Sequence, residues 1–206
     1  MPMQDAQSLF EDLKSHLDGL EEKFIKTFLG VSTADPDDYD LFVRAYCVLS
    51  HAALEEYLEG VALYVMQRSV EDFIFRREVK DTLLTLTAYL GLKLEADENE
   101  SVDETKAFDK LRTLLEDAKT KFSRSVHRNQ GISVKYLRKL LCPVAVDIKQ
   151  DTNLKNSLIQ LAKERGAFAH HRAARKVISP EDAKNFVSDC LELCKDIKEK
   201  IDQKFA

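Results

Sequence analysis

An arginine and two histidines lie close together at the point where an apolar helical pattern ends. Residues 163–172 read Lys-Glu-Arg-Gly-Ala-Phe-Ala-His-His-Arg, so that Arg165 is followed by His170 and His171. Arginine carries a permanent positive charge, and histidine can take up or release a proton near neutral pH. No other segment of the sequence concentrates as many groups that could do chemistry. These three residues are therefore the candidate functional centre.

Arg165 is predicted to lie on the apolar face of its helix. An ideal helix places it on one face with Leu158 and Leu161 instead of on the solvent side. Burying a guanidinium is costly unless it is paired, so we expect a partner from another helix, a ligand or a second subunit. His170 and His171 lie about 140° and about 120° from Arg165 in opposite senses. A loosened last turn would bring one imidazole beside the guanidinium.

A second set of polar residues interrupts a helical pattern that is otherwise apolar over much of its circumference. Arg44, His51 and Glu55 are separated by seven and four residues, a spacing that repeats one helix face. They could form a structural hydrogen-bond network in which Glu55 neutralises Arg44 or His51. Alternatively, His51 could orient a substrate or a catalytic group, because it is ionisable near neutral pH. His16 and His127 are expected to be exposed.

Helix is the expected secondary structure along the whole chain. The 206 residues include only six Gly and four Pro, a composition that favours an all-α fold with one core. Capping patterns at Asp35-Pro36, Ser69–Asp72, Ser101–Glu104 and Ser179–Asp182 mark predicted helix starts. Together with the apolar periodicity they predict helices at about residues 5–29, 36–66, 69–90, 101–128, 133–141, 151–170 and 179–201.

Several classes of protein are disfavoured by the composition. No apolar run reaches the roughly 18 residues of a membrane span, and the N-terminus lacks a signal pattern, so we expect a cytoplasmic protein. The four cysteines are predicted to be reduced core thiols, although Cys190 and Cys194 share a helix face and could form half of a metal site. Without a further cluster of ligands or a glycine-rich phosphate loop, no metal and no cofactor are expected.

The charge is unevenly distributed along the sequence. The net charge is −5, which argues against indiscriminate binding to nucleic acid. Acidic residues crowd the first half of the chain, whereas basic residues gather in the second half. They include Lys119, Lys121, Arg124, Arg128, Lys135, Arg138, Lys139, Arg165, Arg172, Arg175 and Lys176. These side chains could form a phosphate-binding surface if folding brings them together, or they could be the solvated faces of helices.

These residues resemble the HEPN superfamily of helical domains, and within it the RiboL-PSP-like branch. The Arg-x4-6-His signature corresponds to Arg165 with His170, or with His171 one residue later. The segment 44–58 is similar to the family's early helix, and 179–182 is similar to the start of its closing helix. The resemblance covers about residues 37–200. It divides the chain into an N-terminal helix and linker, 1–36, and a HEPN-like helical bundle, 37–206.

The resemblance implies an up-and-down helical bundle that forms a homodimer, with Arg and His of both subunits lining a shared cleft. Active members are metal-independent endoribonucleases, and others are RNA-binding proteins or non-catalytic protein-interaction modules. Carried over to this chain, His170 or His171 would be the general base or acid, and Arg165 would hold the scissile phosphate. Flanking phosphates would be bound by Arg138, Lys139, Arg172, Arg175 and Lys176. The implied setting is defence, stress response or a toxin system, with a neutralising protein partner.

Overall fold

The computed structural model describes residues 4–31, 35–93, 104–148, 151–170 and 177–206, and within these ranges every regular element is helical. The all-α class predicted from the composition is therefore confirmed. In chain order the elements are α1 (Ala6–Phe24), η1 (Lys26–Phe28), α2 (Pro36–Arg76), α3 (Asp81–Leu90), α4 (Glu104–Val126), α5 (Val134–Leu141), η2 (Cys142–Val144), α6 (Thr152–His170) and α7 (Pro180–Phe205).

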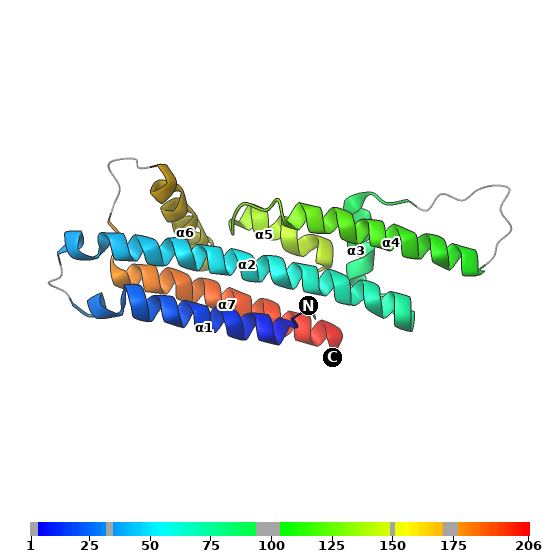
Figure 1. Ribbon diagram of the computed structural model, residues 1–206, viewed down its shortest axis with the longest axis horizontal. Helices are drawn as coiled ribbons and strands as arrows, with labels where there is room; N and C mark the ends of the chain where they lie inside the picture. The colour runs from blue at the N-terminus through cyan, green and yellow to red at the C-terminus, as the bar shows by residue number, and fades with distance from the viewer. Residues whose placement is uncertain (1–3, 32–34, 94–103, 149–150, 171–176) are drawn as a thin grey trace.

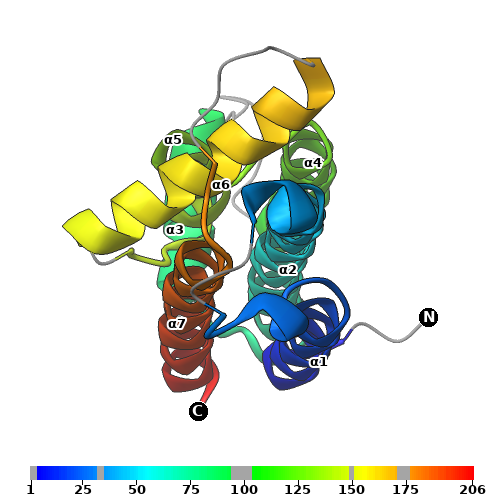
Figure 2. The ribbon, with the colours of Figure 1, turned by 90° about the vertical axis from the view of Figure 1, so that its left-hand side faces the viewer.

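The 41-residue helix α2 is the axis of an up-and-down bundle (Figure 1). Helices α1 and α7 run beside it on one side, and α4 and α5 lie on the other. By the direction of the colours, α7 runs parallel to α2, whereas α1 and α4 run antiparallel to it. Helix α6 crosses the bundle at a steep angle and contacts both α2 and α7 (Figure 2). Helix α2 thus contacts α4, α5 and α6.

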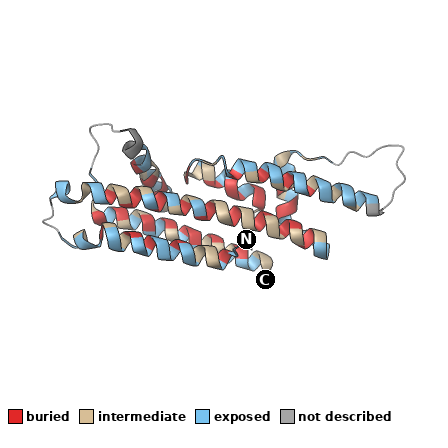
Figure 3. Cartoon of the chain, viewed as in Figure 1, coloured by how far each residue is buried: buried red, intermediate tan, exposed pale blue. Residues whose placement is uncertain are grey.

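One apolar core joins α1, α2, α5, α6 and α7 with part of α4 (Figure 3). Helix α2 is buried on several sides, as its continuous apolar pattern predicts. Leu13, Leu17 and Leu20 of α1 are buried in this same core at the helical spacing read from the sequence. Helix α1 packs directly on α2 and α7, and the proposed division at residue 36 stays a prediction.

Most helix ends follow the capping signals in the sequence. Asp35 accepts a hydrogen bond from the backbone N–H of Asp37 ahead of α2, and Ser179 accepts one from Asp182 ahead of α7. Gly91 ends α3 in the left-handed conformation, with φ 62°. These boundaries are confirmed. The predicted cap at Ser101 lies outside the described residues.

The predicted break at Ser69 is wrong. Helix α2 continues without interruption to Arg76, and Ser69 is buried in its interior. Asp72 pairs with Arg68 and Arg76, whose nitrogens lie 3.4 and 3.5 Å from its carboxylate. These pairs are one turn away on either side, so the carboxylate is neutralised by side chains of the same helix instead of capping a new one. The chain leaves the helix only at Arg77, in the left-handed region.

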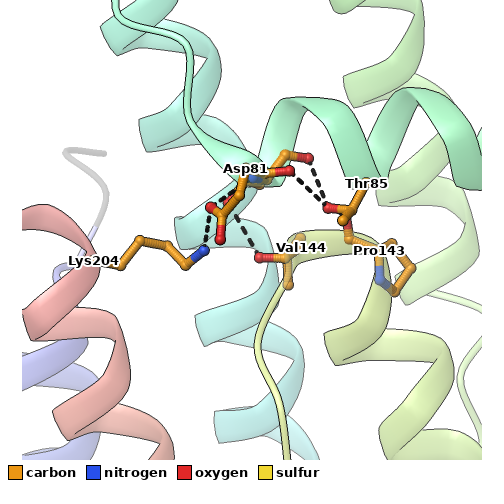
Figure 4. Close-up of polar contacts among 6 residues, drawn as sticks. Asp81, Thr85, Pro143, Val144 and Lys204 are labelled. Carbon is orange, nitrogen blue, oxygen red and sulfur yellow. Dashed lines mark hydrogen bonds and ion pairs between the residues drawn. The ribbon is translucent and has the colours of Figure 1, made fainter.

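The corner formed by α5 and η2 is fixed to α3 by side-chain hydrogen bonds (Figure 4). The hydroxyl of Thr82 donates to the carbonyl oxygen of Val144 at 3.1 Å, and that of Thr85 donates to Pro143 at 2.9 Å. Asp81, at the start of α3, pairs with Lys204 near the end of α7. Because backbone acceptors at this turn have no partner in the helix itself, these bonds set the position of α5.

The remaining sequence predictions about membranes and exposed side chains have mixed outcomes. No described helix is long and apolar enough to span a membrane. His16 and His127 are exposed, as expected. Cys47, Cys190 and Cys194 are buried, but Cys142 is exposed at the turn after α5, so the prediction of four core thiols is wrong for that residue.

We predict that Phe122→Ala destabilises the fold strongly. Phe122 is fully buried and packs α4 into the core. Its removal should lower the free energy of unfolding by about 3–5 kcal/mol, through reduced burial and the cavity left behind. The matched control is Phe75→Ala at a side chain that is 80% exposed, for which a change within about 0.5 kcal/mol is expected. Urea denaturation followed by circular dichroism measures both; equal losses of stability would contradict this account of the core.

Candidate functional site

Arg165, on α6, reaches across to α2 and to the loop after α4. Its Nη1 atom lies 3.4 Å from Oε2 of Glu55 and donates a hydrogen bond to the carbonyl oxygen of Gln130 at 2.8 Å. The expected partner on another helix is therefore present. The side chain nevertheless stays 43% exposed, so one part of it is held by the protein and another can meet a ligand.

The sequence prediction placed Arg165 on a buried stripe, and the structure corrects this. Leu158 and Leu161 are buried as expected, but Arg165 lies where the contact between α2 and α6 opens to solvent. The buried charged residue of this segment is its neighbour Glu164, at 5% exposure. A long arginine side chain can leave an apolar stripe and place its charge at the edge, which avoids the cost of full burial.

Glu55 is shared between Arg165 and His51, which lies one turn earlier on α2. The Nδ1 atom of His51 lies 3.7 Å from Oε2 of Glu55, the oxygen that also faces Arg165. Glu55 is 15% exposed and His51 only 1%. We refer to His51, Glu55 and Arg165 as the Glu55 cluster. Two of the three residues that the sequence placed on one face of α2 therefore meet the candidate arginine.

Burial determines the charge of this cluster. Desolvation, and then the neighbouring positive charge of Arg165, lowers the pKa of His51 to about 4. Burial also raises the pKa of Glu55; the Arg165 charge opposes that shift and the Glu59 charge adds to it. The imidazole is thus neutral at neutral pH and too buried to touch a substrate. Of its two suggested functional roles, only the orientation of another protein group fits this placement.

Gly131 lets the loop after α4 pass close to the Glu55 cluster. Its φ is 153°, a backbone conformation that residues other than glycine rarely adopt. A Cβ atom placed on Gly131 would lie 3.5 Å from Arg165 Nη1, 3.6 Å from Tyr136 Cδ2 and 3.8 Å from His51 Nε2. The Asn129 side chain holds the loop by donating to the carbonyl oxygen of Gly131 at 3.0 Å. This loop, residues 129–131, therefore borders the cluster directly.

Further residues, which were not predicted from the sequence, extend this polar line. Glu59 lies one further turn along α2, and burial raises its pKa, while a hydrogen bond with Asn129 and the nearby charge of His127 oppose the rise. The four-residue spacing from His51 to Glu55 continues to Glu59, so a signal was available. The loop partners had no such signal, because the sequence marks Asn129 and Gly131 only as an interruption of the helix.

Arg44, the third residue predicted on this face, pairs elsewhere. Its Nε atom lies 3.3 Å from a carboxylate oxygen of Asp40, one turn earlier on the same helix. Eleven residues separate Arg44 from Glu55, which is a rise of about 16 Å along α2. A local carboxylate is therefore closer than Glu55, and the predicted neutralisation of Arg44 by Glu55 is wrong.

The basic residues that were predicted to bind RNA do not share one surface. Lys139 lines a pocket of about 380 Å³ together with Lys121, Arg124 and Arg128. Arg138, the next residue to Lys139, instead lines a pocket of about 250 Å³ that includes Asp147 and Asp151. Successive residues of a helix point about 100° apart, which explains the separation.

The histidines of the signature stay predictions. His170 is the last residue of α6, five positions after Arg165, and its side chain is not among those described. His171, Arg172, Arg175 and Lys176 lie outside the described residues.

The described residues contain no group of three or more His, Cys, Asp or Glu side chains arranged to hold a metal ion. Cys190 and Cys194 are buried in α7, and burial raises the pKa of Cys190 to about 12 and also raises the pKa of Cys194 well above its ordinary value. These thiols therefore stay protonated in the apolar core. Their placement fits the interpretation as core thiols.

Comparison with protein-family models matches residues 4–203 to the family described as RiboL-PSP-HEPN. The chain therefore belongs to this family, as the resemblance in its sequence indicated. Membership supports RNA binding or RNA cleavage in general, together with contacts to RNA and to a second subunit. The match includes α1. Searches of curated proteins and of solved structures gave no match.

We predict that His51→Gln weakens the pH dependence of stability. The folded-state pKa of His51 is about 4, against an ordinary value of 6.5. The unfolded chain therefore binds a proton that the folded one does not, so stability is full above pH 6.5 and falls as the pH drops toward 4. Removing His51 should abolish up to about 3 kcal/mol of this loss.

Urea denaturation at several pH values between about 4.5 and 7 measures this effect. His16→Gln, at an exposed position of α1, is the matched control and should keep the wild-type dependence. If the free energy of unfolding varied with pH equally in wild type and His51→Gln, His51 would not be held neutral by the fold.

Proposed function

We propose that the protein is a metal-independent endoribonuclease that binds RNA and positions the scissile phosphate against Arg165. The observation that carries the proposal is that Arg165 is held by protein contacts and is still partly exposed. It is fixed on one side by Glu55 and the carbonyl oxygen of Gln130, yet it stays 43% exposed next to a pocket lined by cations. A guanidinium used only to satisfy a buried carboxylate would not need that exposure.

The Glu55 cluster gives Arg165 a fixed direction. Two acceptors from different elements, a carboxylate on α2 and a backbone carbonyl after α4, hold one end of the guanidinium. A donor that is positioned before the substrate arrives needs no reorganisation when negative charge develops on the phosphate. His51 supports the cluster without contacting RNA, because it is buried and neutral behind Glu55.

The proposed reaction is attack of a ribose 2′-hydroxyl on the adjacent phosphate. One of His170 and His171 takes the hydroxyl proton as the general base, and a protonated imidazole gives a proton to the departing 5′-oxygen. The bond from phosphorus to the 5′-oxygen breaks as the bond to the 2′-oxygen forms. The products are a 2′,3′-cyclic phosphate and a 5′-hydroxyl end, and Arg165 stabilises the charge that builds up on the phosphate oxygens.

A homodimer belongs to this proposal, because the second histidine can come from another copy. Helix α2 also offers apolar side chains to a second copy, since Leu41, Phe42 and Leu49 are exposed. Leu41 and Leu49 are eight residues apart and share one helix face. Sedimentation analysis of the purified protein measures its oligomeric state directly. A cytoplasmic setting in defence, stress response or a toxin system, with a neutralising protein partner, completes the proposal.

We predict that Arg165→Gln lowers kcat/KM for RNA cleavage in the presence of a chelator by about 10²- to 10³-fold. Arg165→Lys should recover only part of this activity, because an ammonium cannot make the paired contacts of a guanidinium. His170→Ala and His171→Ala identify which imidazole acts. Arg112→Gln, at an exposed arginine on α4, is the control and should cleave like wild type.

The products and the variants together decide between the functions. A 2′,3′-cyclic phosphate that Arg165→Gln no longer forms supports the nuclease. RNA binding without cleavage in wild type reduces the function to that of an RNA-binding protein. A wild type that neither cuts nor binds RNA favours the non-catalytic interaction module, in which Arg165 and Glu55 only join two helices.

A further inference from the structure

A pocket of about 380 Å³, here called the basic pocket, is lined by Lys121, Arg124, Ser125, Arg128, Asn129, Tyr136, Lys139 and Leu140. We propose that it binds an unpaired nucleotide next to the scissile phosphate. Its four cations hold backbone phosphates and the Tyr136 ring stacks on the base, so the substrate is single-stranded RNA. This inference rests on the proposed function and specifies the substrate class.

The basic pocket gathers four cationic side chains. Helix α4 and the turn after it supply Lys121, Arg124 and Arg128, and α5 supplies Lys139, while no carboxylate lines the pocket. None of these four cations forms an ion pair with a carboxylate in the described ranges of the chain. Lys119 shows the contrast on the same helix, since its ammonium lies 3.1 Å from Glu116. Four unpaired cations around one hollow favour a polyanion.

Tyr136 adds a flat apolar surface among these charges. The residue is half-buried and lines the basic pocket. The ammonium of Lys139 lies 5.5 Å from the ring centroid. Cationic grooves with aromatic side chains are the usual way in which proteins bind single strands, because every base can stack on a ring while the cations hold its phosphate.

The basic pocket and Arg165 are connected through the 129–131 loop. Asn129 lines the pocket, Gln130 accepts the hydrogen bond from Arg165, and Gly131 has both Tyr136 Cδ2 and Arg165 Nη1 within 3.6 Å of its would-be Cβ position. The ring that would stack on a base is therefore a close neighbour of the guanidinium that would hold the cleaved phosphate. A strand that places one phosphate on Arg165 has its next nucleotide at the basic pocket.

Paired RNA does not fit this arrangement. In an A-form duplex the bases are stacked on one another inside the helix and present their edges, not their faces. Tyr136 could reach a base face only if the base were unpaired. Affinity for a single strand should therefore exceed that for a duplex of the same sequence by at least about fivefold, given the usual gain from one stacked base.

The test uses fluorescence anisotropy with a labelled 2′-O-methyl RNA of about 12 nucleotides, which lacks the attacking hydroxyl and stays intact. Tyr136→Ala should weaken binding about 5- to 150-fold, and Tyr136→Phe should not. Tyr136→Leu keeps apolar bulk without an aromatic face, so it should weaken binding while preserving the thermal stability. Arg124→Gln combined with Arg128→Gln should reduce the salt slope by about 0.7 for each phosphate that the protein no longer neutralises.

The matched control is Lys106→Gln combined with Arg112→Gln, which removes the same charge from exposed positions of α4 outside the basic pocket. Equal effects of the two double variants would overturn the inference, as would tighter binding of the duplex or wild-type affinity in Tyr136→Leu. These results would leave the proposed nuclease intact if Arg165→Gln still abolished cleavage. Failure of the wild type to bind any RNA would overturn both proposals.

Discussion

The arrangement of the site depends on one ion pair, between Glu55 on α2 and Arg165 on α6. The two residues are far apart in the sequence and meet only because α6 crosses the bundle against α2. Partial burial makes the pair strong enough to matter: in full solvent it would be screened, and in the deep core the desolvation of both charges would outweigh their attraction. Its place at the edge of the helix contact avoids both limits and leaves the arginine available to an anion.

The neutral state of His51 is what allows a single carboxylate to serve this cluster. A protonated imidazole would put a second, buried cation beside Arg165 and Glu55. Burial and the Arg165 charge both oppose protonation, so the cluster holds one cation and one anion at neutral pH. The imidazole then fills space behind Glu55 and restricts where its carboxylate can lie. The pairing with Glu55 therefore orients the Arg165 side chain and still leaves its guanidinium available to an anion.

Local signals in the sequence predicted more of this structure than long-range ones. The ends of α2, α3 and α7 follow from Asp35, Gly91 and Ser179, because a cap acts within one turn of its helix. The spacing of His51 and Glu55 likewise predicted a shared face. The continuation of α2 through Ser69 was missed, since a buried serine inside a helix and a capping serine are alike in sequence and differ only in what packs around them. The contacts of Arg165 with Gln130, and of Glu59 with Asn129, bring distant elements together and have no local pattern.

Residues that line neither the basic pocket nor the Glu55 cluster control the distance between the pocket and Arg165. Tyr136 and Lys139 belong to a helix of only eight residues, α5, which is too short to be stable alone. Its position is set by the hydrogen bonds from Thr82 and Thr85 at its C-terminal corner and by its apolar face in the core. The cations of α4 are placed by a different part of that core, through Phe122 and Val126. The 129–131 loop joins these two supports next to Arg165, so the positive φ of Gly131 and the Asn129 side chain keep the pocket and the arginine in one site.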